Sequence, residues 1–360
     1  MSPADAVTDR RHMAHALSLA QRALGRTAPN PAVGCVLVQH GRIAGRGHTQ
    51  PGGRPHAESV ALAQAGAQAA GATAYVTLEP CAHHGQTPPC ADALIDAGIA
   101  RCVVALKDPD PRVAGAGLAR LEQAGLDVTV GVLGDDAARV TAGFLSRISR
   151  QRPLVTAKLA TTLDGKIATA TGASKWITGA LARQRSHLMR AQHDAILVGI
   201  NTVLADDPDL TVRLPGLEDR SPLRIVLDRM GRLPADSRLV RTAADRPTWL
   251  ITESEQRLPG VETVTVKTIE SLGDVLHSLA DRGITRLLVE GGAGVHGGFF
   301  RAGLVDRIAW FRAAGILGAE GLSGVGDLAI GALADMPRFR RVDVLALGDD
   351  MLELYDRAEA

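Results

Sequence analysis

The sequence is poor in aromatic residues and in net charge. Phe, Trp and Tyr make up 3% of its 360 residues, and 40 Lys and Arg side chains nearly balance 39 Asp and Glu, which leaves a formal charge of +1. Such a chain lacks both the positive field that attracts a polyanion and the rings on which bases stack. Nucleic acid is therefore not expected as a partner, and the core must be built from small aliphatic side chains.

Cysteines and long apolar runs are also scarce. The four cysteines do not make a disulfide framework in a chain of this length. Cys35 and Cys102 lie in apolar, strand-like runs and are expected in the core. No segment approaches the roughly 18 consecutive apolar residues of a membrane span, and the N-terminal residues lack the apolar stretch of a signal peptide. A cytoplasmic protein without a membrane partner is expected.

Helix and strand patterns alternate along the whole chain, which predicts an α/β protein. A polar, basic segment, Arg147 to Pro153, predicts a domain boundary and hence domains 1–150 and 151–360. No internal repeat relates the halves, so they are expected to be different α/β modules. The first is predicted to form helices at 13–24, from about 56, at 90–97 and 113–123, and strands at 33–38, 74–78, 101–106 and 127–133. The second is predicted to form strands at 154–159, 195–198, 223–227, 248–251, 261–266, 284–289 and 307–311, and helices at 180–191, 271–281 and 295–302.

One histidine, one glutamate and two cysteines have the pattern of a catalytic zinc site. His56 and Glu58 stand in PHAE, and Cys81 and Cys90 in EPCAHHGQTPPC. One imidazole and two thiolates leave the fourth position of a tetrahedral zinc open, and Glu58 can move protons to and from water there. Each ligand is expected near a helix start, where the dipole favours the thiolate form. H-x-E followed by P-C-x-x-C is the signature of zinc deaminases, so the pattern predicts hydrolytic deamination.

The cysteine spacing departs from that signature, because eight residues rather than two separate Cys81 from Cys90. The longer loop would hang over the metal and shape a pocket for a small substrate. A structural zinc remains the alternative. His83 or His84 would then supply the fourth ligand, which would leave Glu58 without a task.

The motifs of the first half resemble the deaminase domain of the bifunctional riboflavin-biosynthesis deaminase/reductase family. The resemblance lies in PNPAVGC, PHAE, ATAYVTLEPCAHHGQTPPC and KDPDP. It implies a cytidine-deaminase-like three-layer α/β/α domain that removes an amino group from 2,5-diamino-6-(5-phosphoribosylamino)pyrimidin-4-one, with Asn30 bound to the substrate ring. Where the family usually has an aromatic residue and then histidine, this chain has His48 and Thr49, and His48 could substitute.

The second half is similar to the reductase domain of the same family. KLATTLDGKIA, SKWITG, HLMRAQHDAILVGINTVLADDPDLTVR and VEGGAGVHGGFFRAGLVDRI carry the similarity. It implies a dihydrofolate-reductase-like α/β domain that uses NADPH to reduce the ribosyl chain to ribityl, giving 5-amino-6-(5-phosphoribitylamino)uracil. The residues implied at the cofactor are Ala160, Trp176, Thr202, Asp206, Gly292, Ala293, Gly294, Val295, His296, Gly297 and Gly298. The residues implied at the substrate are Ser174, Arg190, Leu210, Arg213 and Glu290.

The residues alone give weaker support for a nucleotide site. A glycine run from Gly291 to Gly298 follows an apolar strand and opens a helix, so its backbone could approach a phosphate, although glycine-rich turns also serve tight packing. It is not a Rossmann fingerprint, because no second βαβ unit with an acidic residue follows it. Arg190 and Arg213 offer planar forks for a sugar phosphate, but either one alone would by default be a solvated surface charge.

The leading interpretation is a homo-oligomeric bifunctional enzyme that acts on a small phosphorylated pyrimidine with Zn²⁺ and NADPH. An RNA-editing deaminase is a second hypothesis, which the neutral, aromatic-poor composition disfavours. A zinc-stabilised interaction module is a third hypothesis, under which Glu58→Gln would change nothing.

Overall fold

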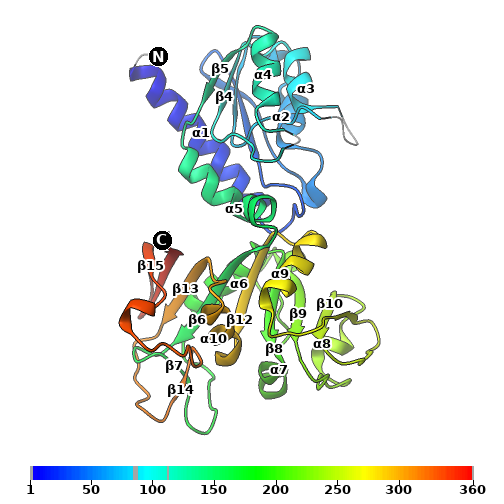
Figure 1. Ribbon diagram of the computed structural model, residues 1–360. Coiled ribbons are helices and arrows are strands. Elements are labelled where there is room, and N and C mark those ends of the chain that lie inside the picture. The colour runs from blue at the N-terminus through cyan, green and yellow to red at the C-terminus, as the bar shows by residue number, and fades with distance from the viewer. Residues whose placement is uncertain (1–2, 84–87, 112, 359–360) are drawn as a thin grey trace. The chain divides into compact units, whose positions relative to one another are not determined.

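The computed structural model describes residues 3–83, 88–111 and 113–358 and divides into two compact units, Met1–Gln151 and Arg152–Ala360 (Figure 1). None of the described helices combines the length and hydrophobicity that a membrane crossing requires. Each unit is an α/β structure with its own sheet.

The first unit is built on a five-stranded sheet in the order β2-β1-β3-β4-β5. The strand β1 runs antiparallel to β2 and β3, whereas β3, β4 and β5 are mutually parallel. The strand bounds are β1 (Gly34–Gln39), β2 (Arg42–His48), β3 (Thr73–Val76), β4 (Arg101–Val104) and β5 (Asp127–Val130).

Helices cover both faces of this sheet, because alternate strand residues point to opposite sides. On β1, Val36 packs on the side of α1 and α5, while Cys35 and Leu37 pack on the side of α2, α3 and α4. Cys35 and Cys102 are both buried, as expected. The helix bounds are α1 (Pro3–Ala23), α2 (Ala57–Ala65), α3 (Cys90–Asp96), α4 (Ala116–Gln123) and α5 (Gly134–Arg150), with 3-10 turns η1 (Pro51–Gly53) and η2 (Gly66–Ala69). The expected three-layer α/β/α fold is confirmed.

The second unit is built on a nine-stranded sheet in the order β11-β10-β9-β8-β12-β6-β13-β16-β15. The strands from β11 to β13 are parallel, and β16 and β15 extend one edge as an antiparallel ribbon. The bounds are β6 (Leu154–Thr161), β8 (Ala195–Gly199), β9 (Leu223–Leu227), β10 (Thr248–Thr252), β11 (Glu262–Thr265), β12 (Arg286–Gly291), β13 (Arg307–Arg312), β15 (Phe339–Leu347) and β16 (Asp350–Arg357). A separate pair joins β7 (Lys166–Ala168) and β14 (Leu322–Ser323).

Two apolar clusters lie on the two faces of this sheet. One includes α9 and α10, and the other includes α6, α7 and α8. Because the central strands are parallel, their carboxyl ends meet at one edge of the sheet, where α/β proteins bind ligands. The bounds are α6 (Ala180–Ala191), α7 (Ile200–Asp206), α8 (Arg238–Arg241), α9 (Leu272–Asp281) and α10 (Ala293–Arg301), with η3 (Glu218–Arg220) and η4 (Leu333–Asp335).

Several elements were not predicted from the sequence. The strand β2 has little apolar signal because it packs through Gly45 and Gly47, and β15 and β16 form a ribbon with many exposed side chains. The helix α5 includes the first part of the basic segment that suggested a linker. Arg147 and Arg150 form its last turn, where positive charge is favourable.

Two glycines allow β2 to pack closely against α2. A Cβ atom on Gly47 would lie within 3 Å of the Ala57 oxygen and the Ala61 nitrogen, and one on Gly45 would lie within 3 Å of the Ala61 oxygen. These are backbone atoms of α2, so relief requires the helix to move.

We expect Gly47→Ala to destabilise the first unit by about 2 to 3 kcal/mol, the upper part of the range for overpacking. Native-state hydrogen exchange of the α2 amides in the full chain measures this loss. Gly273→Ala in α9 is the control, because nothing lies within 4 Å of the added Cβ. Unchanged protection in the Gly47 variant would contradict the packing argument.

Candidate active sites of the two units

The three expected metal ligands come together in the first unit. His56 precedes the first residue of α2, Cys90 is the first residue of α3, and Cys81 lies in the connection between β3 and α3. The His56 Nδ1 atom lies 3.7 Å from the Cys81 Sγ and 3.4 Å from the Cys90 Sγ, and all three donor atoms lie within 4.8 Å of one another. Cys81 does not belong to a helix, but its Sγ accepts the Cys90 N–H at 3.3 Å and therefore lies near the start of α3, as expected for each ligand.

The donor set fits a zinc ion. With bonds of about 2.3 Å to sulfur and about 2.0 Å to nitrogen, two ligands of a tetrahedral ion lie roughly 3.5 Å apart, close to the two separations observed. The Cys90 thiol, and then His56, lower the pKa of Cys81 to about 4, whereas Cys81 and burial raise the pKa of Cys90. A second thiolate beside the first thus requires a cation between them.

Glu58 lies beside these ligands without belonging to the donor cluster. It occupies the first turn of α2, and its side chain is buried. Burial, and then the neighbouring Cys81, raise the pKa of Glu58 to about 7. A carboxyl group with this pKa can both accept and donate a proton near neutral pH.

A pocket of about 140 Å³ opens beside the metal ligands and also contains Asn30, Thr49 and His83. The Asn30 Nδ2 group donates to the Gly53 oxygen at 3.1 Å, which orients this amide. Thr49, rather than His48, lines the pocket. The Thr49 hydroxyl donates to the Pro31 oxygen and accepts the Val33 N–H.

A structural zinc would need a fourth protein ligand, and no further described residue joins the three donor atoms. The buried His83 Nδ1 atom has no hydrogen-bond partner in the described part of the chain, but it does not join the donor cluster. His84 lies outside the described residues.

Four charged pocket residues were not predicted as site residues: Arg54, Glu79, Asp108 and Asp110. Glu79 is a positioning residue, because its carboxylate accepts backbone N–H bonds from Asp108, Gly115, Gly117 and Leu118 at 3.0 to 3.3 Å. Glu79 and the two aspartates belong to the EPC and KDPDP motifs. Their positions after β3 and β4 could have identified them as site residues from the sequence.

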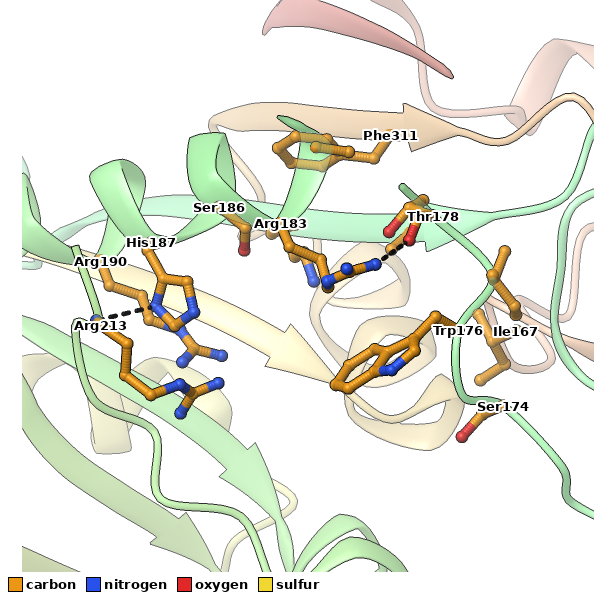
Figure 2. Close-up of a pocket in the computed structure, with 14 residues that line it drawn as sticks. Ile167, Ser174, Trp176, Thr178, Arg183, Ser186, His187, Arg190, Arg213 and Phe311 are labelled. Atoms are coloured by element: carbon orange, nitrogen blue, oxygen red, sulfur yellow. Dashed lines mark hydrogen bonds between the residues drawn. The ribbon is translucent and has the colours of Figure 1, made fainter. Parts of the chain in front are cut away.

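A second pocket, of about 200 Å³, lies in the second unit (Figure 2). It brings together five of the residues implied by resemblance: Ala160, Ser174, Trp176, Arg190 and Arg213. Among the other lining residues, which were not predicted, are Lys158, Arg183, His187 and Phe311.

The charges of this pocket are largely positive. Trp176 is 69% exposed, and the Arg183 guanidinium lies 4.7 Å from its ring centroid, a cation–π arrangement. Burial lowers the pKa of His187 to about 4, so its imidazole is neutral at pH 7. Lys158 could have been found in the sequence, because it is a lysine inside the apolar strand β6.

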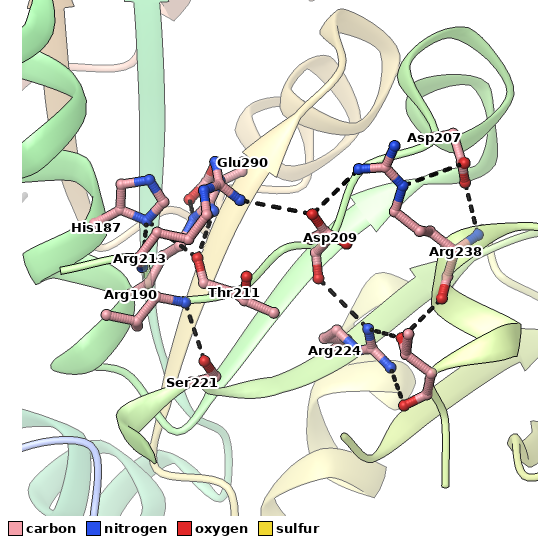
Figure 3. A network of polar contacts seen from close by, with 12 residues as sticks. His187, Arg190, Asp207, Asp209, Thr211, Arg213, Ser221, Arg224, Arg238 and Glu290 are labelled. Carbon is pink, nitrogen blue, oxygen red and sulfur yellow. Dashed lines mark hydrogen bonds and ion pairs between the residues drawn. The ribbon is translucent and has the colours of Figure 1, made fainter. Parts of the chain in front are cut away.

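Glu290 carries the negative charge that balances Arg190 and Lys158 (Figure 3). Its carboxylate accepts bonds from Arg190 Nε at 2.7 Å and Nη2 at 2.9 Å, and Lys158 Nζ lies 3.7 Å away. Burial alone would raise the pKa of Glu290, but the charges of Arg190 and Lys158 lower it to about 2. The third Arg190 contact, from Nη1 to the Thr211 oxygen at 2.9 Å, fixes the plane of the guanidinium.

A cleft of about 520 Å³ runs along one face of α10, from Gly294 and Val295 in its first turn through Gly298 to Arg301 and Ala302 at its end. A Cβ on Gly294 would meet nothing within 4 Å, so the missing side chain leaves open space over the first turn of the helix. Thr202 Oγ1 lies 3.5 Å from where a Cβ on Gly292 would be. This open backbone fits the phosphates of a dinucleotide.

Three other residues implied by resemblance line neither the second pocket nor the cleft along α10. The His296 side chain is buried, with its ring nitrogens 3.2 and 3.3 Å from the Gly324 and Val289 oxygens, so it does not face the cleft. The Leu210 side chain is also buried in the core. Asp206 is half exposed and lies 3.4 Å from Lys175, the residue before Trp176.

Comparisons with known proteins agree with both sites. Residues 6–106 match the cytidine and deoxycytidylate deaminase zinc-binding region, and residues 153–352 match the RibD C-terminal domain. Riboflavin biosynthesis protein RibD of Aquifex aeolicus is 44% identical, with 97% of this chain and 98% of that protein covered, and the Escherichia coli protein of the same name is 43% identical, with 95% and 98% covered.

Solved structures give the same result. Acinetobacter baumannii RibD, form 1, is 39% identical with a TM-score of 0.90, and 98% of this chain and 100% of that chain are covered. The diaminohydroxyphosphoribosylaminopyrimidine deaminase/5-amino-6-(5-phosphoribosylamino)uracil reductase of Thermotoga maritima is 36% identical with a TM-score of 0.89 at the same coverage. The chain therefore belongs to the RibD family of bifunctional riboflavin-biosynthesis deaminase/reductases.

Proposed function

We propose that the two reactions of this enzyme are divided between domains 1–150 and 151–360. The enzyme deaminates 2,5-diamino-6-(5-phosphoribosylamino)pyrimidin-4-one with zinc and then reduces the ribosyl chain with NADPH, giving 5-amino-6-(5-phosphoribitylamino)uracil. The convergence of His56, Cys81 and Cys90 beside the buried Glu58 supports the assignment of the first reaction to domain 1–150.

In the first site, we assign the metal ligands to His56, Cys81 and Cys90. A zinc ion held by these three residues would activate a water as the nucleophile at neutral pH. Glu58 would accept a proton from the attacking water and deliver a proton to the leaving amine, a double task that suits its raised pKa. Asn30 orients the pyrimidine ring, and Glu79 holds the segment that carries Asp108.

Exchanging Glu58 should separate chemistry from metal binding. We expect Glu58→Gln to retain one zinc per chain. The rate of ammonia release should fall at least about 100-fold, because the glutamine side-chain amide cannot accept and return a proton as the carboxylate does. Cys90→Ser should lose zinc and ammonia release together. Metal analysis and an ammonia assay measure both.

Both variants should still oxidise NADPH when they are given the already deaminated substrate. A folded Cys90→Ser enzyme that loses both activities would contradict two separate sites. Full ammonia release by Glu58→Gln would contradict the proton-transfer role.

In the second site, we assign the substrate to the pocket of Ser174, Arg190 and Arg213, with Glu290 and the backbone at Leu210 fixing its shape. Bound NADPH supplies the hydride that the sugar carbon accepts. The pocket lining contains Lys158, Arg183, Arg190 and Arg213 and no carboxylate among the described residues, which suits a sugar phosphate. Glu290 keeps the Arg190 fork in one orientation, while Arg213, at 54% exposure, is accessible to the phosphate.

The cofactor of this site is assigned to the neighbouring residues. The open backbone from Gly292 to Gly298, together with Ala160, Trp176, Thr202 and Asp206, would hold NADPH. Support comes from the open space over Gly294 in the cleft along α10 and from the side chain of Thr202 beside Gly292. The buried His296 contributes through its backbone.

Removing the fork of Arg213 should weaken substrate binding more than it slows turnover. We expect Arg213→Met to raise the KM for the deaminated substrate about 10- to 100-fold, the value of a charge-assisted hydrogen-bond pair, with kcat changed less. Steady-state kinetics of NADPH oxidation measure this change. Arg241→Met in α8 is the control arginine, and equal KM values in both variants would exclude Arg213 as the phosphate ligand.

The proposal also includes a cytoplasmic homo-oligomer. Several apolar side chains of the second unit are exposed, as is common at subunit interfaces: Ile316, Leu317, Leu322, Leu333 and Met336. Analytical ultracentrifugation of the full chain would establish the oligomeric state.

A further inference from the structure

One side of α6 presents polar side chains to the pocket of the second unit. Arg183, His187 and Arg190 follow one another at intervals of four and three residues, so they lie on the same side of the helix, and all three line the pocket. Arg183 contacts Trp176, and Arg190 is paired with Glu290. His187, between these two arginines along the helix, has no role in the binding of substrate or cofactor as assigned so far.

The His187 ring is held at one of its two nitrogens. Its Nδ1 atom lies 3.0 Å from the Thr211 oxygen and 3.3 Å from the backbone nitrogen of Arg213 (Figure 2). The side chain is half-buried, and Nε2 has no hydrogen-bond partner among the residues that the structure describes. Nε2 is therefore the ring nitrogen that is available to a ligand of the pocket.

The two contacts of Nδ1 require opposite forms of a neutral imidazole. Nδ1 must carry the ring proton to donate to the Thr211 oxygen, and it must lack that proton to accept the Arg213 N–H. The Thr211 oxygen already accepts Arg190 Nη1 at 2.9 Å, so it does not depend on His187. When Nδ1 accepts the Arg213 N–H, the ring proton is on Nε2, which then donates into the pocket.

The charges around the ring favour a bound anion. Burial, and then the charges of Arg190 and Arg213, lower the pKa of His187 to about 4, so the ring is neutral at pH 7. The nearest carboxylates do not cancel this effect, because Glu290 is already ion-paired with Arg190 and Asp209 lies 4.0 Å from Arg213. The positive potential that disfavours a second proton on the ring stabilises an anion beside it.

We propose that His187 is a ligand of the substrate phosphate, and that its Nε2–H group donates to the same phosphate that Arg213 binds. A hydrogen bond to a charged acceptor is stronger than one between neutral groups, so one neutral donor on a fixed ring adds to the preference for a phosphorylated substrate. The same ring accepts the Arg213 N–H and thereby holds the backbone of that arginine. The inference rests on the proposed reductase function and adds a residue that recognises its substrate.

The test compares the deaminated substrate with and without its phosphate, in steady-state NADPH oxidation by the full-length, zinc-loaded enzyme. We expect His187→Asn and His187→Leu to lower kcat/KM for the phosphorylated substrate about 10-fold, mainly through KM, and to leave kcat/KM for the dephosphorylated substrate within about twofold. His187→Gln should stay within about threefold of the wild type for both substrates. The side-chain nitrogen of glutamine reaches as far as Nε2 of histidine, whereas that of asparagine reaches only as far as Nδ1.

His277→Asn is the matched control, because His277 is an exposed histidine of α9 that does not line the pocket. If the wild type uses both substrates equally well, the proposed phosphate site itself fails. If Arg213→Met loses the preference for the phosphorylated substrate and His187→Asn keeps it, only the inference about His187 fails. Equal losses with both substrates in His187→Asn, or a His187→Gln enzyme as impaired as His187→Leu, would also overturn it.

Discussion

The first unit depends on holding two sulfur atoms and one imidazole nitrogen within 4.8 Å of one another. Cys81 raises the pKa of Cys90, so a cation held between the two sulfurs favours the thiolate form of both. The geometry of this cluster is set by the frame around it. The Cys90 N–H donates to the Cys81 sulfur, and the close packing of α2 on the glycines of β2 fixes the position of His56. The buried Glu58 is aligned by the same helix turn.

The second unit stabilises its buried charges by ion pairing. Its pocket contains basic side chains, and Glu290 offsets the charges of two of them, Arg190 and Lys158. The pKa of Glu290 stays near 2, so this carboxylate remains ionised throughout the working range of pH. Arg190 is thereby held in one plane, while Arg213 is accessible to a ligand. In the first unit burial raises the pKa of Glu58 to about 7. In the second unit ion pairs lower the pKa of Glu290 and keep this carboxylate charged.

The sequence predicted many of the elements that have a strong apolar period, but it missed the amphipathic helix α5, whose last turn belongs to the basic segment that suggested a linker. The central parallel strands of both sheets are largely buried and apolar, which is why they were found, whereas the edge strands β5 and β11 are partly exposed. The strand β2 packs through glycine, and the β15–β16 ribbon has many exposed side chains, so neither has the pattern of a buried strand. The metal cluster was predicted because its ligands and Glu58 occupy short motifs, and the packing that orders these motifs could not be read from spacing.

Three of the residues missed in the first site share a position in the topology. Glu79, Asp108 and Asp110 follow β3 and β4, at the carboxyl ends of parallel strands. Polar residues just after an apolar strand are therefore candidates for a site even when they belong to no motif, because parallel strands bring these ends to one edge. Periodicity predicts which strands are parallel and buried, but not their order in the sheet. The meeting of Glu79 with the backbone of Asp108, which requires β3 and β4 to be neighbours in the sheet, therefore became apparent only in the folded structure.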